Sequence, residues 1–281
     1  MSEQHKHGAT TTDTASSFRV AAVQTVSTPE PAENMQAVAR LVRDAAEAGA
    51  QLVVLPEYWA ILGQRDTDKV AHAEAPGEGP LQAFMAALAQ EHRLWLLGGT
   101  IPLQSGVDGK VRNTLLAYAP DGSLAARYDK IHLFGFTRGE ESFGESRTIL
   151  PGNDVAVLHT PFARIGLSIC YDLRFPELYR AMGQCDLIVV PSAFTYTTGR
   201  AHWEVLLRAR AIENQCYALA AAQGGRHVNG RRTWGHSLLV DPWGEVKACQ
   251  PEGEGIVVGD IDRSLIDGVR ASLPALKHRR L

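Results

Sequence analysis

The apolar residues of this chain follow two patterns that alternate along its length, short continuous runs and faces that repeat every three to four residues. Runs such as 51–56 (QLVVLP) and 186–191 (DLIVVP) are too continuously apolar for half-exposed strands, so they predict strands covered on both faces. Residues 31–48 carry apolar side chains at helical spacing and precede Gly49, which predicts a helix between the first two strands. This order predicts a βαβ unit within an α/β fold.

The same patterns predict the remaining elements. Strands are expected at 18–24, 51–56, 94–100, 155–158, 165–169, 186–191, 217–222, 236–240 and 255–261, with a hairpin at 113–127 around the turn 120–122. Helices are expected at 31–48, 81–88, 176–182 and 201–214, the last with an apolar repeat of Val205, Leu206, Ala209 and Ile212. Because hairpins interrupt the alternation of strands and helices, we expect two mixed sheets packed together with helices outside.

The chain is predicted to form a single domain, because no linker or repeat divides residues 18–270. Residues 1–17 are polar and are expected to be a disordered N-terminal segment. In residues 271–281, Pro274 blocks a helix, and Leu273 and Leu276 would be stranded apolar groups near the terminus. We therefore expect this C-terminal arm of the same domain to pack at a subunit interface, and the alternative is a fraying tail.

Composition and charge exclude several classes of protein. The 281 residues have a net charge of −3, which provides no basic surface for nucleic acid or anionic membranes, and no apolar run has the length of a membrane span. The N-terminal residues lack the apolar core of a signal peptide. The four cysteines are widely spaced, without a C-x-x-C pair or a Cys/His cluster, so neither a disulfide framework nor a metal site is predicted. We expect a cytoplasmic protein with a small-molecule partner and no cofactor.

A thiol stands at the end of one predicted strand. The apolar alternation of 165–169 stops at Cys170, and Pro176 opens a helical pattern shortly afterwards. Side chains at such a strand end lie in the crevice where open α/β sheets place their chemistry. Cys170 is therefore a candidate nucleophile, and the alternative is a buried, unreactive cysteine.

Three further polar residues follow apolar segments. Glu57 comes directly after the run 51–56 and has aromatic neighbours, a setting that suits a general base. Lys130 lies among apolar residues after the hairpin, where its charge could stabilise an oxyanion. Glu145 offers a second carboxylate. Taken alone, each of the three also has a simpler interpretation as a surface residue.

Together these residues form an ordered set of motifs. Glu57 lies in L-P-E, Lys130 in D-K-I-H-L and Glu145 in F-G-E-S, while Cys170 begins C-Y-D-L-R-F-P-E. The set resembles the carbon–nitrogen hydrolase (nitrilase) superfamily, and the resemblance extends over 18–281. It implies a four-layer αββα sandwich of two mixed sheets flanked by helices, assembled as a homodimer or a higher even homo-oligomer. It also implies a catalytic triad of Glu57, Lys130 and Cys170, with Glu145 in a supporting role.

The physical chemistry of amide hydrolysis fits these residues. We expect Lys130 and the helix N-terminus after Cys170 to lower the pKa of the thiol, since a thiolate is a stronger nucleophile than water. Lys130 and the backbone N–H of Tyr171 would stabilise the tetrahedral oxyanion. Glu57 would give a proton to the leaving ammonia and then take one from the water that hydrolyses the thioester.

The expected substrate is a small amide that bears a carboxylate. Arg174 could pair with this carboxylate, or it could form a structural ion pair with Glu177 or Asp172. The chain continues from the strand 186–191 into the same crevice, which should be lined by Phe194, Thr195 and Tyr196. Further positive charge that would suit an acidic substrate comes from three arginines that could equally be solvated, Arg138, Arg226 and Arg231.

Within the superfamily, the sequence looks most like the Nit branch, which acts on deaminated glutathione. This resemblance lies in three segments, 220–227, 235–237 and 241–244. That resemblance implies an amidase that forms acid and ammonia through a cysteine thioester. The alternatives are an ω-amidase acting on 2-oxoglutaramate-type substrates, a nitrilase, an N-carbamoyl amidase, and a catalytically silent binding protein that keeps the fold.

Overall fold

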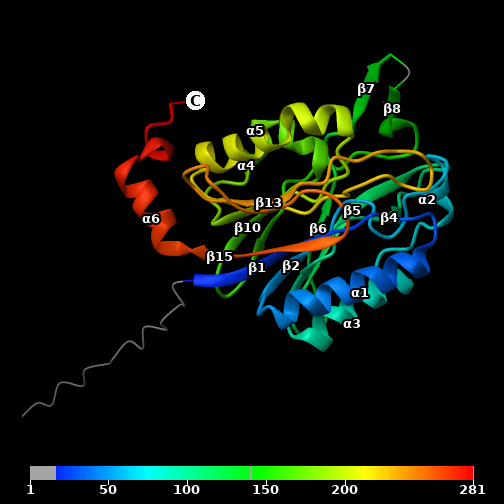
Figure 1. The fold of residues 1–281 in the computed structure, drawn as a ribbon, viewed down its shortest axis with the longest axis horizontal. Helices are drawn as coiled ribbons and strands as arrows, with labels where there is room; N and C mark the ends of the chain where they lie inside the picture. Colours follow the sequence, from blue (N-terminus) through cyan, green and yellow to red (C-terminus); the bar gives the residue numbers. More distant parts are fainter. Residues whose placement is uncertain (1–16, 140, 281) are drawn as a thin grey trace, which may run out of the picture.

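A computed structural model describes residues 17–139 and 141–280 of the chain. The predicted disordered segment 1–17 lies outside the described residues except for Ser17, which begins the first strand. Within the described residues, two large mixed sheets are packed face to face between helices, as predicted (Figure 1).

The first sheet has seven strands in the order β15-β1-β2-β3-β5-β4, with β6 paired to β5. Strands β1, β2 and β3 are parallel to one another, and the other pairings are antiparallel. The strands span Ser17–Gln24 (β1), Leu52–Val54 (β2), Trp95–Leu97 (β3), Ile101–Gln104 (β4), Val111–Tyr118 (β5), Leu124–Asp129 (β6) and Gly255–Asp262 (β15).

The second sheet has six strands in the order β14-β13-β12-β11-β10-β9. Its centre, β10, β11 and β12, is parallel, and its edges are antiparallel. The strands span Val157–His159 (β9), Arg164–Leu167 (β10), Leu187–Val189 (β11), Tyr217–Ala220 (β12), Ser237–Val240 (β13) and Val246–Gln250 (β14).

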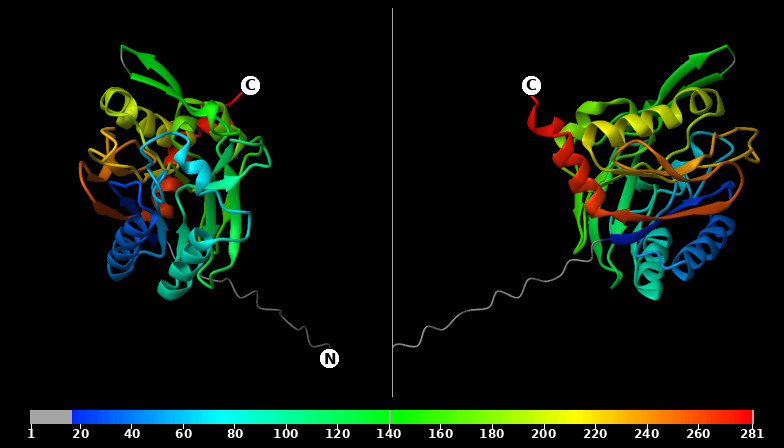
Figure 2. Two further views of the ribbon diagram at one scale, coloured as in Figure 1. Left: turned by 90° about the vertical axis from the view of Figure 1, so that its right-hand side faces the viewer. Right: turned by 60° about the vertical axis from the view of Figure 1, so that its left-hand side comes forward.

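Helices cover the outer faces of both sheets. Figure 1 shows α1 and α3 on the side of the first sheet and α4 and α5 on the side of the second, and Figure 2 shows the same layers from two other directions. The helices span Pro31–Glu47 (α1), Asp68–Ala71 (α2), Pro80–His92 (α3), Pro176–Ala181 (α4), Tyr196–Asn214 (α5) and Arg263–Ser272 (α6). Three 3₁₀ helices span Glu145–Arg147 (η1), Cys170–Arg174 (η2) and Ala275–Lys277 (η3).

The strand β1 shows how the core is divided. Val20 and Ala22 belong to the core that includes the space between the sheets, whereas Ala21 and Val23 belong to the core under α1 and α3. Successive side chains of a strand point to opposite faces, so a strand covered on both sides must be apolar throughout. The continuous apolar runs in the sequence therefore have a direct structural cause.

Helix α5 differs from its prediction in two ways. It begins at Tyr196, five residues before the predicted start, because the side chain of Thr195 caps it by accepting a hydrogen bond from the Thr198 amide. Its buried face includes Trp203 and Leu207, whereas Val205 and Ile212 of the predicted apolar repeat are 68% and 47% exposed. The repeat therefore does not form the core-facing side of the helix.

Two other segments bear on the function. A hairpin of β7 (Gly135–Arg138) and β8 (Glu141–Gly144) projects from the body of the molecule in Figure 1, within a segment we had expected to be irregular. The expected C-terminal arm begins with Ala271 and Ser272, which are the last two residues of α6. None of the helices in residues 17–139 and 141–280 combines the length and the apolar character needed to cross a bilayer.

Candidate active site

The four polar residues singled out in the sequence lie together, and each comes within three residues of the end of a strand. Glu57 follows β2 and Lys130 follows β6, so both come from the first sheet. Cys170 follows β10 of the second sheet and is the first residue of η2. Glu145 follows the β7–β8 hairpin and begins η1. The site therefore lies where strand ends of the two sheets meet.

Lys130 lies between two carboxylates and has no exposed surface. Its Nζ atom is 2.8 Å from Glu57 Oε1, 2.9 Å from Glu145 Oε1 and 2.8 Å from Glu145 Oε2. The side chains of Lys130, Glu57 and Glu145 are 0%, 1% and 12% exposed, which rules out the surface interpretation of all three. Burial alone would lower the pKa of Lys130, but the charges of Glu145 and Glu57 outweigh it and raise that pKa.

The carboxylate of Glu57 is held from both sheets. Asn113 in β5 donates to Oε1 at 2.9 Å, and the backbone N–H of Ala193, which follows β11, donates to Oε2 at 2.9 Å. These contacts leave the carboxylate one orientation, directed at Lys130 and Cys170. A proton acceptor held in this way needs little reorganisation during a reaction.

The carboxylate of Glu145 is fixed by two hydrogen bonds from outside its own segment. The Tyr58 hydroxyl donates to Oε1 and the Phe134 backbone N–H to Oε2, both at 2.7 Å. Burial opposes the ionisation of Glu145, but the charge of Lys130 and these hydrogen bonds outweigh it and lower the pKa of the carboxyl. Glu145 therefore acts as a fixed anion beside Lys130.

Cys170 occupies a strained turn. Its φ of +50° lies in the left-handed region, which costs a residue other than glycine about 1 kcal/mol or more. Its backbone N–H donates to the Pro191 carbonyl at 2.9 Å, which ties the turn to the end of β11. Tyr58, directly after Glu57, also has a positive φ of +56°. Backbone strain thus accompanies two of the segments that form the site.

The expected lowering of the Cys170 pKa was wrong. Burial raises the pKa of the thiol well above its usual range, the charge of Glu57 raises it further, and the opposing effect of Lys130 is too small to reverse this. The 3₁₀ helix that follows has only five residues and offers little dipole. The resting site therefore holds a neutral thiol next to a carboxylate that can accept its proton.

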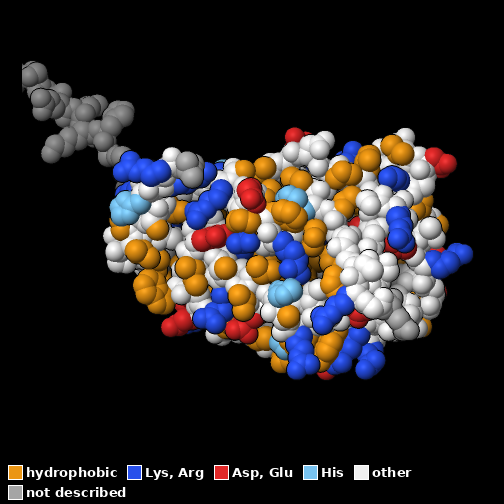
Figure 3. Space-filling model, turned by 90° about the horizontal axis from the view of Figure 1, so that it is seen from above, with side chains coloured by type: hydrophobic (Ala, Val, Ile, Leu, Met, Phe, Trp, Pro, Cys, Tyr) orange, Lys and Arg blue, Asp and Glu red, His pale blue; other side chains and the backbone are white. Residues whose placement is uncertain are grey.

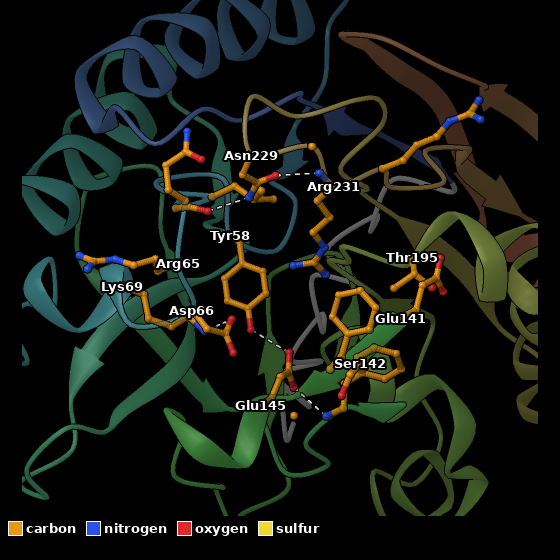
Figure 4. Close-up of a pocket in the computed structure, with 18 of the residues that line it drawn as sticks. Tyr58, Arg65, Asp66, Lys69, Glu141, Ser142, Glu145, Thr195, Asn229 and Arg231 are labelled. Carbon is orange, nitrogen blue, oxygen red and sulfur yellow. Dashed lines mark hydrogen bonds and ion pairs between the residues drawn. The ribbon is translucent and has the colours of Figure 1, made fainter. Parts of the chain in front are cut away.

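Two neighbouring cavities reach Cys170 and Glu145, whereas Glu57 and Lys130 line neither of them. The cavity at Cys170 has about 10 Å³ of free space, room for about one water molecule, and is also lined by Arg174, Phe194 and Thr195. A larger cavity of about 640 Å³ lies outside it and is lined by Tyr58, Glu145 and the β8 residues of the hairpin (Figure 4). Phe134 and Thr195 line both, so they mark the join.

The predicted substrate-binding residues all line one of these cavities. Tyr171 and Phe194 line the inner cavity, Thr195 lines both and Tyr196 lines the outer one. Of the three additional arginines, Arg231 lines the outer cavity, whereas Arg138 and Arg226 are exposed and line neither.

Arg174 is free of the ion pairs that we had considered. Its guanidinium lies 5.7 Å from the ring centre of Tyr171 and 5.4 Å from that of Phe194, and Nη1 lies 3.3 Å from His202 Nδ1. The Asp172 carboxylate is instead occupied by Tyr128 and His132. Among the described residues, no ion pair involves Arg174.

Sequence reasoning missed the residues that orient the site. Asn113, Tyr58 and Ala193 act through contacts between segments that are distant in sequence. The one available signal was Asn113 itself, a polar residue followed by a buried threonine inside an otherwise apolar strand. In the described part of the chain, no three or more His, Cys, Asp or Glu side chains are grouped so that they could hold a metal ion.

Comparison with known proteins identifies the family to which the chain belongs. Residues 19–271 match the family model described as carbon-nitrogen hydrolase. A deaminated glutathione amidase from Synechocystis sp. strain PCC 6803 is 41% identical over 268 residues, which cover 93% of this chain and 98% of the relative. The human omega-amidase NIT2 is 39% identical over 268 residues, covering 94% of this chain and 95% of the relative.

A solved structure shows the same fold. Nit3 from Saccharomyces cerevisiae, a member of branch 10 of the nitrilase superfamily, aligns with a TM-score of 0.84 and 32% identity, covering 94% of this chain and 97% of that one. The expected family resemblance and the sandwich of two sheets are thereby confirmed. The interpretation as an enzyme is confirmed over that of a silent binding protein.

Proposed function

Because the chain belongs to the carbon–nitrogen hydrolase family and is a hydrolase of carbon–nitrogen bonds, we propose that it acts as a cysteine amidase on a small carboxylate-bearing amide. The favoured substrate is of the deaminated glutathione type, which is what the Synechocystis relative is named for. The observation that carries the proposal is the buried group of Glu57, Lys130, Glu145 and Cys170.

The first proposed step is acylation of the thiol. Glu57 takes the proton of Cys170 as sulfur attacks the amide carbonyl, which suits a thiol whose pKa is raised by burial. The tetrahedral oxyanion is stabilised by Lys130 Nζ and the backbone N–H of Tyr171. Glu57 then passes its proton to the leaving nitrogen, and a thioester on Cys170 remains.

The second proposed step is hydrolysis of the thioester. Glu57 takes a proton from the attacking water, the oxyanion forms again at the same place, and the acid leaves as the thiol recovers its proton. Glu145 acts by holding Lys130 in position, since both of its oxygens accept from Nζ. No cofactor takes part in either step.

Arg174 is proposed to bind the carboxylate of the acyl group. It lines the cavity at Cys170, which must widen beyond its room for about one water molecule to admit the acyl group. Its planar guanidinium can donate two parallel hydrogen bonds to a carboxylate. A second candidate substrate is an ω-amide such as 2-oxoglutaramate, which is favoured by the 39% identity to a human omega-amidase. The two candidates differ in the leaving group. An ω-amide releases ammonia, whereas both amides of deaminated glutathione are substituted on nitrogen, so its cleavage releases an amine in place of the ammonia expected from the sequence.

The proposed assembly is a homodimer or a higher even homo-oligomer. Val205 and Ile212 of α5 are exposed, as is Trp243 (59%), and Ile212 lies against Gly244 next to that tryptophan. Figure 3 views the side of the molecule that carries α5, where hydrophobic side chains are mixed with Lys and Arg. An apolar surface of this kind suits a second subunit, with the C-terminal arm near it.

The free state of all four cysteines supports a cytoplasmic location.

A substrate panel with purified protein tests the activity. We expect wild-type protein to hydrolyse deaminated glutathione or 2-oxoglutaramate, with products measured by mass spectrometry, and Cys170→Ala to abolish turnover without unfolding. An N-carbamoyl amino acid and a simple nitrile complete the panel. Hydrolysis of the nitrile alone would refute the amidase proposal, and turnover by Cys170→Ala would refute the nucleophile.

A further inference from the structure

Arg231 reaches into the outer cavity from the loop between β12 and β13. Figure 4 shows its side chain directed towards the space beside Tyr58, and its guanidinium carbon lies 5.2 Å from the ring centre of Phe143 on the opposite wall. The guanidinium therefore lies inside the cavity, between two aromatic side chains.

The hydrogen-bonding capacity of this guanidinium is largely unused. Nη2 donates to the Ala193 carbonyl at 3.3 Å, whereas Nε is buried without a hydrogen-bond partner. No ion pair among the described residues involves Arg231. Two other cations of the cavity have carboxylate partners, since Lys69 is 3.2 Å from Asp66 and Arg232 is 2.7 Å from Glu252. Arg147 also lines the cavity and forms no ion pair within the described part of the chain, but its side chain is exposed.

The contact with Ala193 places Arg231 at the boundary of the two cavities. Ala193 lines the inner cavity, and its N–H donates to Glu57 while its carbonyl accepts from Arg231. Arg174 lines the inner cavity and Arg231 the outer one. Because the thiol lines the inner cavity, a substrate that extends from Cys170 into the outer cavity would pass Arg231.

We infer that Arg231 binds a carboxylate on the leaving-group side of the substrate. This inference rests on the proposed amidase function and defines its substrate class more narrowly, as amides whose leaving amine ends in a carboxylate. A glutathione-type substrate has this feature whichever of its two amides is cleaved, because the amine released ends in the glycine carboxylate. An ω-amide releases ammonia, which carries no carboxylate, so Arg231 would not contribute to binding its leaving group.

The test compares two substrates that differ only at the distal group, deaminated glutathione and its C-terminal carboxamide. Wild-type protein is expected to prefer the acid in kcat/KM by about 10- to 100-fold, mainly through KM, as a charged hydrogen-bonded pair would give. Arg231→Gln should remove that preference. Arg231→Lys should retain only part of it, because lysine keeps the charge and loses the planar fork.

Two control variants test whether the preference for the acid depends on Arg231 itself or on positive charge anywhere near the cavity. Arg226→Gln removes an exposed arginine of the same loop, and Arg147→Gln removes one from the rim of the cavity. Both are expected to keep the wild-type preference for the acid. An unchanged preference in Arg231→Gln, or its loss in Arg147→Gln instead, would overturn the inference and leave the amidase function standing. Failure of wild-type protein to hydrolyse either compound or 2-oxoglutaramate would overturn both.

Discussion

Lys130 illustrates how a single residue depends on its neighbours in this site. An ammonium group without exposed surface loses its hydration, and removing one partner of such a group leaves an uncompensated charge. Two carboxylates offset this loss, and each is held by further hydrogen bonds from Asn113, Ala193, Tyr58 and Phe134. The positive charge is therefore permanent at the pH values where an enzyme works.

Glu57→Gln is expected to make the Cys170 thiol more acidic while it abolishes most turnover. Burial stays the same, the raising effect of the Glu57 charge disappears, and Lys130 still lowers the pKa of the thiol. The pH midpoint of iodoacetamide alkylation should therefore shift to lower pH, because the thiolate is the reacting species. Amide turnover should fall by about 100-fold or more with the loss of the base.

Mass spectrometry of the labelled peptide measures this midpoint for Cys170 alone. The Cys170→Ala protein accounts for labelling elsewhere, since Cys249 is exposed. A midpoint that stays in place or moves to higher pH in Glu57→Gln would show that Glu57 does not control the thiol.

Glu57 and Cys170 could be predicted because each directly follows an apolar run, a change that is visible in one sequence. Lys130 follows Asp129 and was predicted from the apolar residues after it in the motif D-K-I-H-L. The ionisation of Cys170 could not be predicted, because it depends on how closely Glu57 approaches and how deeply both are buried. The sequence does not distinguish Arg231 from Arg138 and Arg226, because only the folded structure shows that Arg231 lines the outer cavity.

Among the elements, η2 is the one that presents the nucleophile. The Asp172 carboxylate accepts from the Ile169 N–H at 2.9 Å, the Tyr128 hydroxyl at 2.7 Å and the His132 N–H at 3.0 Å. These bonds join the strained turn at Cys170 to the segment that follows Lys130. Asp172 thus helps to hold the turn that carries the thiol against the segment that carries the ammonium.

Asp172→Ala should lower the free energy of unfolding by at least about 2 kcal/mol, because buried donors lose their acceptor. Urea unfolding followed by circular dichroism measures the change. Asp154→Ala removes an exposed carboxylate and should stay within about 0.5 kcal/mol of wild type. Equal stability of the two variants would contradict this account of the turn.

Burial explains part of the difference between predicted and missed elements, although the missed strand β4 has three buried residues of four and the predicted strand β6 is largely exposed. Strands covered on both sides, such as β2 and β11, are continuously apolar and were predicted. Strand β14 and the β7–β8 hairpin are largely exposed, so their sequences resemble loops, and they were missed. The face of α5 was misassigned because its buried side includes Arg210, whose Nε donates to the Leu173 carbonyl.

At the scale of the whole molecule, the site requires the two sheets to be packed in one relative position. The acceptor Glu57 belongs to the first sheet, yet one of its oxygens is held by a backbone amide that follows a strand of the second. The thiol comes from the second sheet and Lys130 from the first. The core between the sheets therefore aligns the reacting groups as well as stabilising the fold.

The exposed face of α5 leads to a prediction about assembly. The double substitution Val205→Glu and Ile212→Glu should shift the proposed dimer towards monomer, because charge would replace apolar contact area at its centre. Size-exclusion chromatography with light scattering measures the mass. Val107→Glu, at an exposed valine of a different surface, should leave the mass unchanged. A double variant that keeps the wild-type mass would exclude this face as the interface.

The arrangement of Glu57, Glu145, Lys130 and a neutral thiol has a consequence for the whole reaction cycle. Two carboxylates and one ammonium give the resting group one net negative charge. In the proposed mechanism that charge passes from Glu57 to the oxyanion as Glu57 takes up the thiol proton, and it returns when the leaving nitrogen is protonated. The net charge of these groups and the oxyanion stays constant from the free enzyme through both tetrahedral states. The enclosed site thus never has to accommodate a new net charge, and the desolvation of its ions is completed when the chain folds.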